Sequence, residues 1–326
     1  MTDRMILVVV EHDAGAPDRL SVEALALGRD LATAAGVPLH AVAWGSGVAG
    51  AVGALASSGV AVLHAIDDPR LNDYAPEAIG LALTQLVERD RPVAVLGTGS
   101  DRGVEVMAHM AARTGLPLAA NCTEVRLGDP WQATRQRWGG SLLEEVRLAG
   151  TTRLLTVAPH AVEPALAPSA AATTVDAFTP ALTDREFRVR ITSRVPAEAG
   201  KISLADARVV VGGGRGVGSA EGFAQLDELA ALLGGTVGVS RVVTSAGWRP
   251  HAQQVGQTGT RIAPDLYIAC GISGAIQHMV GARSAKAILA INTDRDAPMV
   301  TRATYAVIGD LHTVLPAIIA AVRAAR

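Results

Sequence analysis

The sequence predicts an α/β protein with two doubly wound domains, each built on a mostly parallel sheet. Three observations support this prediction. Short apolar runs rich in β-branched residues alternate with helical segments of about a dozen residues. The chain has 326 residues, enough for two domains of ordinary size. Aromatic residues make up only 3% of the chain while Ala, Gly and Val are abundant, which suits helices packed closely on a parallel sheet.

The first half of the chain alternates regularly. Residues 5–11 form an apolar strand-like run, and apolar residues then recur at helical spacing from Leu20 to Leu31, until Gly36-Val37-Pro38 ends the helix. We then expect strands at 39–44, 60–66 and 92–96, and helices at 49–57, 75–89 and 103–113. Alternation of this kind indicates right-handed βαβ units, and thus a nucleotide-binding-like N-terminal domain.

The regular alternation of strands and helices ends at about Pro117. We expect strands at 119–127, 133–137, 142–147 and 154–157 without long helices between them, which favours an antiparallel extension of the sheet. Residues 160–182 are rich in Ala, Pro, Ser and Thr and are predicted to be loop, and Phe187–Thr192 is a candidate last strand. A hinge is predicted at residues 196–201. The predicted domains are therefore 1–200 and 201–326.

A second βα series follows and is compact. Strands are predicted at 207–211, 236–239, 266–270, 287–291 and 305–308, and helices at 223–233, from Gly274 onward, and to Ala325 at the end. Five strands in about 120 residues make a small doubly wound domain of the flavodoxin or Rossmann type. Such a domain binds its ligand at the carboxyl ends of the strands.

Charge and composition exclude several functional classes. The net charge is −2 and both signs are interspersed, so we expect neither a nucleic-acid partner nor stable membrane insertion. The opening apolar run is too short for a signal peptide, and the uncharged stretch 31–66 is interrupted by Pro38, His40 and His64. The two cysteines, Cys122 and Cys270, carry no motif and fit a reducing compartment. The sequence thus predicts a cytoplasmic protein.

The stretch VVVGGGRGVGSAEGF does not match the dinucleotide fingerprint. The two possible registers need Gly or Ala at positions that hold Val217 and Ser219, and the second strand ends in Ser240-Arg241 instead of an acidic residue. A NAD site of the usual type is therefore disfavoured. Arg215 and Arg241 would follow adjacent strands, however, which favours a ligand contact over a solvated turn.

The stretch VGQTGTRIAPDLYIACGISGAIQH concentrates polar residues and glycines around a buried strand. A strand that runs into Gly271-Ile272-Ser273-Gly274 offers free backbone N–H groups, which suit an anion. The residues near His278 form no metal set, and Ser273 does not lie in a nucleophile elbow. Taken alone, His278 would more often be structural and Asp310 a helix cap. Together the stretch indicates binding, without a catalytic residue.

An ordered set of motifs in the C-terminal third resembles the α subunit of electron transfer flavoproteins, the FixB family. The motifs are GGRG at 213–216, SR at 240–241, VGQTG at 255–259, PDLYIACGISGAIQH at 264–278, AIN at 290–292 and GDL at 309–311. The first 200 residues match more loosely, mainly in the opening strand that ends in EHD. The chain departs from the family pattern at Ser245, Thr304 and His312, which affects the potential more than cofactor binding.

The resemblance implies one FAD in the C-terminal domain. Arg241 would lie against the isoalloxazine, Thr258 near its N5 edge, and His278 near the N1–C2 carbonyl edge, where a donor and a positive charge favour the reduced flavin. Asn292 and Asp310 would meet the adenosine. The residues implied to contact FAD are Arg215, Ser240, Arg241, Val255, Gly256, Gln257, Thr258, Ser273, Gly274, Ala275, Ile276, Gln277, His278, Asn292, Asp310 and Leu311.

The same resemblance implies an electron carrier instead of a classical enzyme. A β subunit would pair with the N-terminal domain, flavin dehydrogenases of the acyl-CoA type would donate electrons, and a quinone oxidoreductase or another acceptor would receive them. AMP or a second FAD would belong to the β subunit. Two alternatives remain open: a component of a bifurcating, NADH-oxidising flavoprotein, and a non-redox protein that binds an adenine nucleotide.

Overall fold

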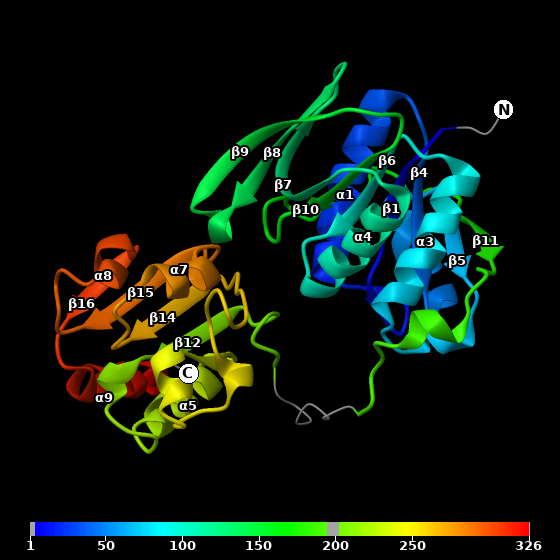
Figure 1. Ribbon diagram of the computed structural model, residues 1–326. Coiled ribbons are helices and arrows are strands. Elements are labelled where there is room, and N and C mark those ends of the chain that lie inside the picture. The colour runs from blue at the N-terminus through cyan, green and yellow to red at the C-terminus, as the bar shows by residue number, and fades with distance from the viewer. Residues whose placement is uncertain (1–3, 194–201, 326) are drawn as a thin grey trace. The chain divides into compact units, whose positions relative to one another are not determined.

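The computed structural model describes residues 4–193 and 202–325, and the chain divides into two compact units, residues 1–194 and 195–326 (Figure 1). The domain boundary and the hinge predicted near residue 200 lie outside the described residues. Each unit is an α/β fold, as the sequence predicts. In the described part of the chain, no helix combines the length and the apolar character needed to cross a membrane.

A nine-stranded sheet forms the centre of the N-terminal unit, in the order β11-β5-β4-β1-β6-β10-β7-β8-β9. The strands are β1 (Ile6–Val9), β4 (Leu39–Trp44), β5 (Val62–Ile66), β6 (Ala94–Thr98), β7 (Leu118–Arg126), β8 (Trp131–Arg137), β9 (Leu142–Leu148), β10 (Arg153–Val157) and β11 (Thr174–Phe178). The pairs from β11 to β7 are parallel, and β7-β8-β9 are antiparallel. The predicted antiparallel extension is therefore confirmed.

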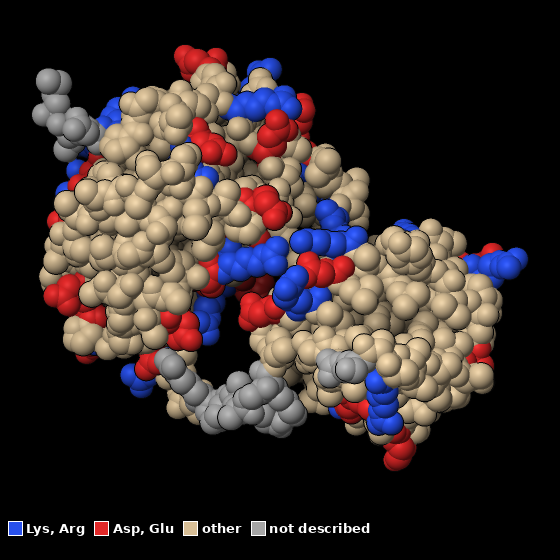
Figure 2. Space-filling view, turned by 180° about the vertical axis from the view of Figure 1, so that it is seen from behind, with Lys and Arg blue, Asp and Glu red and all other residues tan. Residues whose placement is uncertain are grey.

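The α-helices in the described part of this unit are α1 (Arg19–Ala35), α2 (Val52–Ser57), α3 (Pro76–Asp90) and α4 (Asp101–Thr114). A small hairpin, β2 (His12–Asp13) and β3 (Ala16–Pro17), precedes α1. The side chain of Asp18 caps α1, and Gly36, at φ 65°, ends it. Single turns of 3₁₀ helix occur at 48–51, 69–72, 138–140 and 184–187. On the face of this unit visible in Figure 2, charges of both signs are interspersed.

Two predictions for residues 160–192 are wrong. The predicted loop 160–182 contains β11, and the predicted strand 187–192 is absent from the described residues, where a 3₁₀ turn at Asp184–Phe187 is followed by irregular chain. β11 is an edge strand whose side chains are largely exposed, so it shows little hydrophobic alternation. Its hydrogen bonds come from β5, more than a hundred residues earlier, which local patterns cannot reveal.

Alternate residues of β1 face the two sides of the sheet. Ile6 and Val8 belong to one buried cluster, with Leu25 of α1, while Leu7 and Val9 belong to a second, with Leu83 of α3. Both faces of the sheet are therefore covered by helices, as expected for a parallel sheet.

The C-terminal unit has a five-stranded, wholly parallel sheet in the order β13-β12-β14-β15-β16. The strands are β12 (Val209–Gly213), β13 (Thr236–Val239), β14 (Leu266–Cys270), β15 (Ala287–Asn292) and β16 (Tyr305–Ile308). The helices are α5 (Phe223–Leu232), α6 (Arg241–Ser245), α7 (Ile276–Ala282), α8 (Pro298–Arg302) and α9 (Leu311–Ala324), with 3₁₀ turns at 215–217 and 251–253. The short helices α6 and α8 were not predicted.

Helices cover both faces of this second sheet (Figure 1). Phe223 of α5 and Leu315 of α9 share one buried cluster, and Met279 of α7 and Met299 of α8 belong to the cluster on the other face. The strand order is the flavodoxin-like order, in which the direction of winding reverses between the first and third strands. The crevice is therefore expected at the carboxyl ends of β12 and β14.

Candidate functional site

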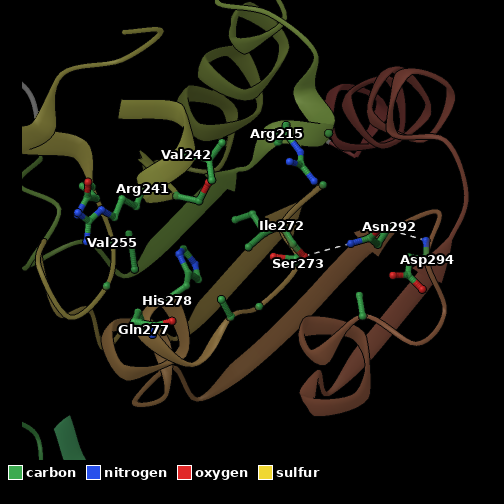
Figure 3. Close-up of a pocket in the computed structure, with 18 of the residues that line it drawn as sticks. Arg215, Arg241, Val242, Val255, Ile272, Ser273, Gln277, His278, Asn292 and Asp294 are labelled. Atoms are coloured by element: carbon green, nitrogen blue, oxygen red, sulfur yellow. Dashed lines mark hydrogen bonds between the residues drawn. The ribbon is translucent and has the colours of Figure 1, made fainter. Parts of the chain in front are cut away.

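A cavity of about 850 Å³ opens at the carboxyl ends of the C-terminal sheet (Figure 3). Its wall is formed by the segments that follow all five strands, together with the loop 254–258. This volume lies at the upper end of the range of roughly 300–1,000 Å³ for small-molecule sites, so a ligand of dinucleotide size can be accommodated. The position is the switch point that the strand order predicts.

Glycines allow the loops after β12 and β14 to meet backbone to backbone. The Gly214 N–H donates to the Cys270 carbonyl over 2.9 Å, and the Gly216 N–H donates to the Gly271 carbonyl over 3.1 Å. A Cβ atom at Gly216 would lie 2.8 Å from the Gly271 Cα, and Gly271 itself has φ 61°. The floor of the cavity therefore requires glycine at these positions.

The loop after β14 also presents unused backbone donors. Among the described residues, the N–H groups of Ile272, Ser273, Gly274 and Ala275 donate no hydrogen bond. All four residues belong to the cavity wall. Several free N–H groups on one short loop make a site that favours an anion, as the sequence predicts.

Two arginines contribute positive charge. Arg215 follows β12 and Arg241 follows the adjacent strand β13, and both belong to the cavity wall. Neither forms an ion pair with a described residue, whereas other arginines of this unit, such as Arg208 and Arg249, are paired with aspartates. Figure 3 shows Arg215 directed into the cavity. Unpaired cations at such a position favour an anionic ligand.

A buried glutamine connects two of the loops. Gln254 is 2% exposed, and its amide nitrogen donates to the Thr258 hydroxyl over 3.0 Å. Its amide oxygen accepts from the Thr244 hydroxyl over 2.6 Å, and Thr244 Oγ1 also lies 2.9 Å from the Arg241 carbonyl oxygen. Gln254 thereby links helix α6, which carries Arg241 and Thr244, to the loop that carries Thr258. Sequence reasoning did not single it out.

His278, at the start of α7, is 7% exposed and belongs to the cavity wall. Its Nε2 atom lies 2.8 Å from the hydroxyl of Tyr267, while its buried Nδ1 atom has no hydrogen-bond partner among the described residues. Burial lowers the pKa of His278 to about 4, although the Val255 carbonyl opposes the shift. The imidazole is thus neutral near pH 7 in the protein alone.

The polar residues after β15 and β16 make local structural contacts. Asn292 donates from its amide to the Ile272 carbonyl over 3.1 Å and accepts from the Asp294 N–H over 3.0 Å, as Figure 3 shows. Asp310 accepts from the His312 N–H over 2.9 Å and caps α9. The helix cap expected for Asp310 is therefore confirmed. Both residues also belong to the cavity wall.

The structure brings all but one of the predicted cofactor contacts around this single cavity. Those in the wall are Arg215, Ser240, Arg241, Val255, Gly256, Gln257, Thr258, Ser273, Gly274, Ala275, Gln277, His278, Asn292, Asp310 and Leu311. Ile276 is the exception, because its side chain is 62% exposed and the residue does not belong to the wall. Ile276 is the first residue of α7, and its neighbours Ala275 and Gln277 both belong to the wall.

The wall also contains residues that sequence reasoning did not assign to it. Val242 and Ser245 lie on α6, Gln254 precedes the VGQTG motif, and Asp294 follows β15. Val242 and Gln254 are adjacent in sequence to predicted contacts, and Asp294 and Ser245 lie two and four residues from one, so proximity is the only signal that could have indicated them. Helix α6 brings Ser245 back toward the cavity, and the sequence did not predict that helix.

The corresponding switch point of the N-terminal unit is arranged differently. There Glu11 follows β1, and its carboxylate accepts hydrogen bonds from the hydroxyls of Thr98, the last residue of β6, and of Ser100 just beyond it. Ser100 in turn caps α4 by accepting from the Gly103 N–H over 2.8 Å. The protein's own carboxylate therefore occupies the position at which a nucleotide-binding fold commonly holds a phosphate.

Comparisons with known proteins agree with this division of the chain. Residues 6–183 match the electron transfer flavoprotein domain, and residues 203–283 match the electron transfer flavoprotein FAD-binding domain. An electron transfer flavoprotein subunit alpha from Mycobacterium tuberculosis is 38% identical over 323 residues, covering 98% of both chains. Protein FixB from Clostridium saccharobutylicum is 36% identical over 320 residues, covering 97% of this chain and 95% of that one. The subunit alpha from Thermoanaerobacterium thermosaccharolyticum is 33% identical over 317 residues, covering 96% of both.

Proposed function

Because the chain belongs to the family of electron transfer flavoprotein α subunits, which includes proteins named FixB, we propose that it carries one FAD in the cavity of its C-terminal unit. As one subunit of a heterodimer, it would carry electrons from flavin dehydrogenases of the acyl-CoA type to a quinone oxidoreductase or another acceptor. It would act as a carrier, without a bond-breaking step of its own.

The observation that carries this proposal is the pair of unpaired arginines beside a loop of free backbone N–H groups. Arg215, Arg241 and the N–H groups of 272–275 surround a cavity large enough for a dinucleotide. The buried Nδ1 atom of His278, which has no hydrogen-bond partner in the described part of the chain, is a further polar atom that a ligand could satisfy. An anionic ligand with a flat polar ring, such as FAD, fits this set of donors.

Each group has a role in this proposal. Arg215 and the N–H groups of 272–275 would bind the pyrophosphate, as unpaired donors near a strand end do. Arg241 would lie against the isoalloxazine, Thr258 near its N5 edge and His278 near its N1–C2 carbonyl edge. The bound FAD would supply the redox chemistry, and positive charge beside it would favour its reduced forms.

The adenosine would meet the far end of the cavity. Asp310 uses one carboxylate oxygen to cap α9, and its second oxygen has no hydrogen-bond partner among the described residues. That oxygen can accept from a ribose hydroxyl. Asn292 uses both ends of its amide within the protein, so it would shape this end of the cavity more than bind through it.

A β subunit would complete the carrier and pair with the N-terminal unit, and it would hold AMP or a second FAD. The test is to produce the chain together with a β subunit from the same organism and to record the absorbance spectrum and the flavin content. We expect flavin bands and one FAD for each α subunit. A heterodimer that stays colourless after incubation with FAD would refute the proposal.

The flavin count also separates two forms of the proposal. One flavin per heterodimer, with no oxidation of NADH, supports a simple carrier. Two flavins per heterodimer, with oxidation of NADH, would instead indicate a bifurcating flavoprotein. A matched control is the heterodimer with both Arg215→Ala and Arg241→Ala, which should retain subunit pairing and lose most of its flavin.

A further inference from the structure

Behind the wall of the cavity lies a tyrosine that contacts His278. Tyr267, on β14, is fully buried and does not belong to the cavity wall. Its hydroxyl lies 2.8 Å from His278 Nε2, and the two rings are stacked with centroids 6.1 Å apart and an interplanar angle of 26°. The ring of His278 is therefore held at one nitrogen by a group that does not belong to the cavity wall.

The positions of the protons follow from counting donors and acceptors. Burial raises the pKa of Tyr267, so its hydroxyl keeps its proton. In the described part of the chain, His278 Nε2 is the one hydrogen-bond partner of this hydroxyl. A buried hydroxyl donates its proton to an available acceptor, so Nε2 must carry the lone pair. A neutral imidazole then carries its single proton on Nδ1.

A glycine on β12, Gly212, leaves the space that the Tyr267 side chain occupies beside His278. A Cβ atom at Gly212 would overlap the hydroxyl and ring of Tyr267. Glycine in the interior of a strand weakens the strand, and it commonly marks a place where another group approaches closely. At Gly212 the approaching group is the Tyr267 hydroxyl.

We propose that Tyr267 is a positioning residue that holds His278 as the Nδ1–H tautomer, so that His278 meets the cofactor as a neutral hydrogen-bond donor with a defined ring orientation. This inference rests on the proposed FAD site for the identity of the acceptor. Although the Val255 carbonyl acts on the imidazole, Nδ1–H has no partner in hydrogen-bonding geometry among the described residues. A buried donor of this kind destabilises the protein until a ligand acceptor satisfies it. Tyr267 therefore prepares the site before the cofactor arrives.

The first test uses the chain without cofactor. In the ¹⁵N-labelled chain at pH 7, long-range ¹H–¹⁵N correlations distinguish a protonated Nδ1 from a protonated Nε2, and the signals missing from His278→Gln identify His278. We expect the proton on Nδ1 in the natural chain and a mixture of tautomers in Tyr267→Phe. A natural chain with the proton on Nε2, or a Tyr267→Phe chain that keeps the single Nδ1–H tautomer, overturns the inference.

The second test uses the heterodimer and FAD. Tyr267→Phe removes the hydrogen bond that orients His278. The variant should therefore bind FAD about three- to tenfold more weakly, and its flavin potential should shift. The matched control is Tyr305→Phe, because Tyr305 lies in the same unit and is 66% exposed. Equal FAD affinity and equal potential in the two variants would overturn the role of Tyr267 toward the cofactor.

The two tests also separate this inference from the proposed function. If the natural heterodimer fails to bind FAD, the proposed function falls and the role of His278 toward a flavin falls with it. The tautomer measurement still decides whether Tyr267 orients His278, because it needs no cofactor. If FAD binds and the tautomer is wrong, only the inference about Tyr267 falls.

Discussion

At the scale of single residues, the site is defined by which charges are left unpaired. Arg215 and Arg241 have no ion-pair partner among the described residues, while Asp310 is used as a helix cap and Asp294 accepts from the Asp296 N–H over 2.9 Å. The acidic groups at the cavity are therefore engaged in local structure. The arginines can act on a ligand without competition from a fixed carboxylate.

Removal of one of these charges gives a direct prediction. We expect Arg241→Ala to lower the two-electron potential of the bound flavin by roughly 30 mV for each 1.4 kcal/mol of lost stabilisation of the reduced form. Arg241→Lys should recover part of the loss, because it restores the charge. Spectroelectrochemical titration measures the potential. Arg302→Ala, at an exposed arginine of the same unit, is the control, and equal potentials in Arg241→Ala and this control would contradict the prediction.

The lowered pKa values of two histidines predict that the protein loses stability in acid. Burial, and in His40 also the neighbouring His64, lowers the pKa of His40 and of His278 to about 4, compared with about 6.5 in the unfolded chain. Between these values the unfolded chain binds more protons than the folded one. Stability is therefore expected to fall as the pH is lowered from 6.5 toward 4.

Thermal unfolding followed by circular dichroism between pH 7 and pH 4 measures this effect. The variant His40→Gln should show a smaller decrease over the same range, because it removes one of the groups that must take up a proton. A decrease as steep as that of the natural chain would show that His40 does not contribute.

At the scale of elements, the loops between strands and helices determine the shape of the cavity. Gly274 has φ 80°, and a Cβ atom there would overlap the backbone of Met299, the second residue of α8. The Met299 N–H donates to the Ser273 carbonyl over 3.0 Å, so α8 is joined to this loop. A residue in the loop after β14 thus determines how closely the segment after β15 approaches.

A pair of glycine variants isolates this contact. Gly274 and Gly234 both have positive φ, but a Cβ atom at Gly234 would meet nothing within 4 Å. We expect Gly234→Ala to cost about 1–2 kcal/mol of unfolding free energy from backbone strain, and Gly274→Ala about 2–5 kcal/mol because overlap is added. Urea unfolding measures both values. Gly274→Ala should also weaken FAD binding, and equal costs in the two variants would exclude a role for the overlap.

At the scale of the whole molecule, the protein consists of two units, and each unit has its own buried core. Over residues 4–193 and 202–325, the buried clusters of the N-terminal unit contain no residue of the C-terminal unit, and the reverse also holds. Each unit thus has the basis to unfold as its own cooperative step. The proposed ligand site lies entirely in one of them.

Calorimetry of the chain should therefore show a separate unfolding transition for each of the two units. We expect FAD to raise the unfolding temperature of the C-terminal unit alone, by a stabilisation of about 2.7 kcal/mol at a free FAD concentration one hundred times the dissociation constant. The N-terminal transition should stay in place. Equal shifts of both transitions would show that the units unfold together, and the double variant Arg215→Ala and Arg241→Ala provides the control without strong binding.

Local patterns in the sequence determined most of the elements and the position of the site. The strands Thr236–Val239, Leu266–Cys270 and Tyr305–Ile308 have the predicted bounds, because apolar β-branched runs between turn residues are a local signal. The glycine-rich and polar stretches were also visible, since a ligand site at strand ends needs both within a few residues. The family resemblance depends on the same stretches.

Only the tertiary structure decided which distant groups meet. The pairing of β11 with β5, the contact of Gln254 with Thr244 and Thr258, the gap left by Gly212 and the contact of Tyr267 with His278 each depend on the spatial arrangement of the chain. A hydrogen bond forms between atoms about 3 Å apart in space, whatever their separation along the chain. Local sequence patterns specify which elements form, and packing then determines which of their atoms come within that distance.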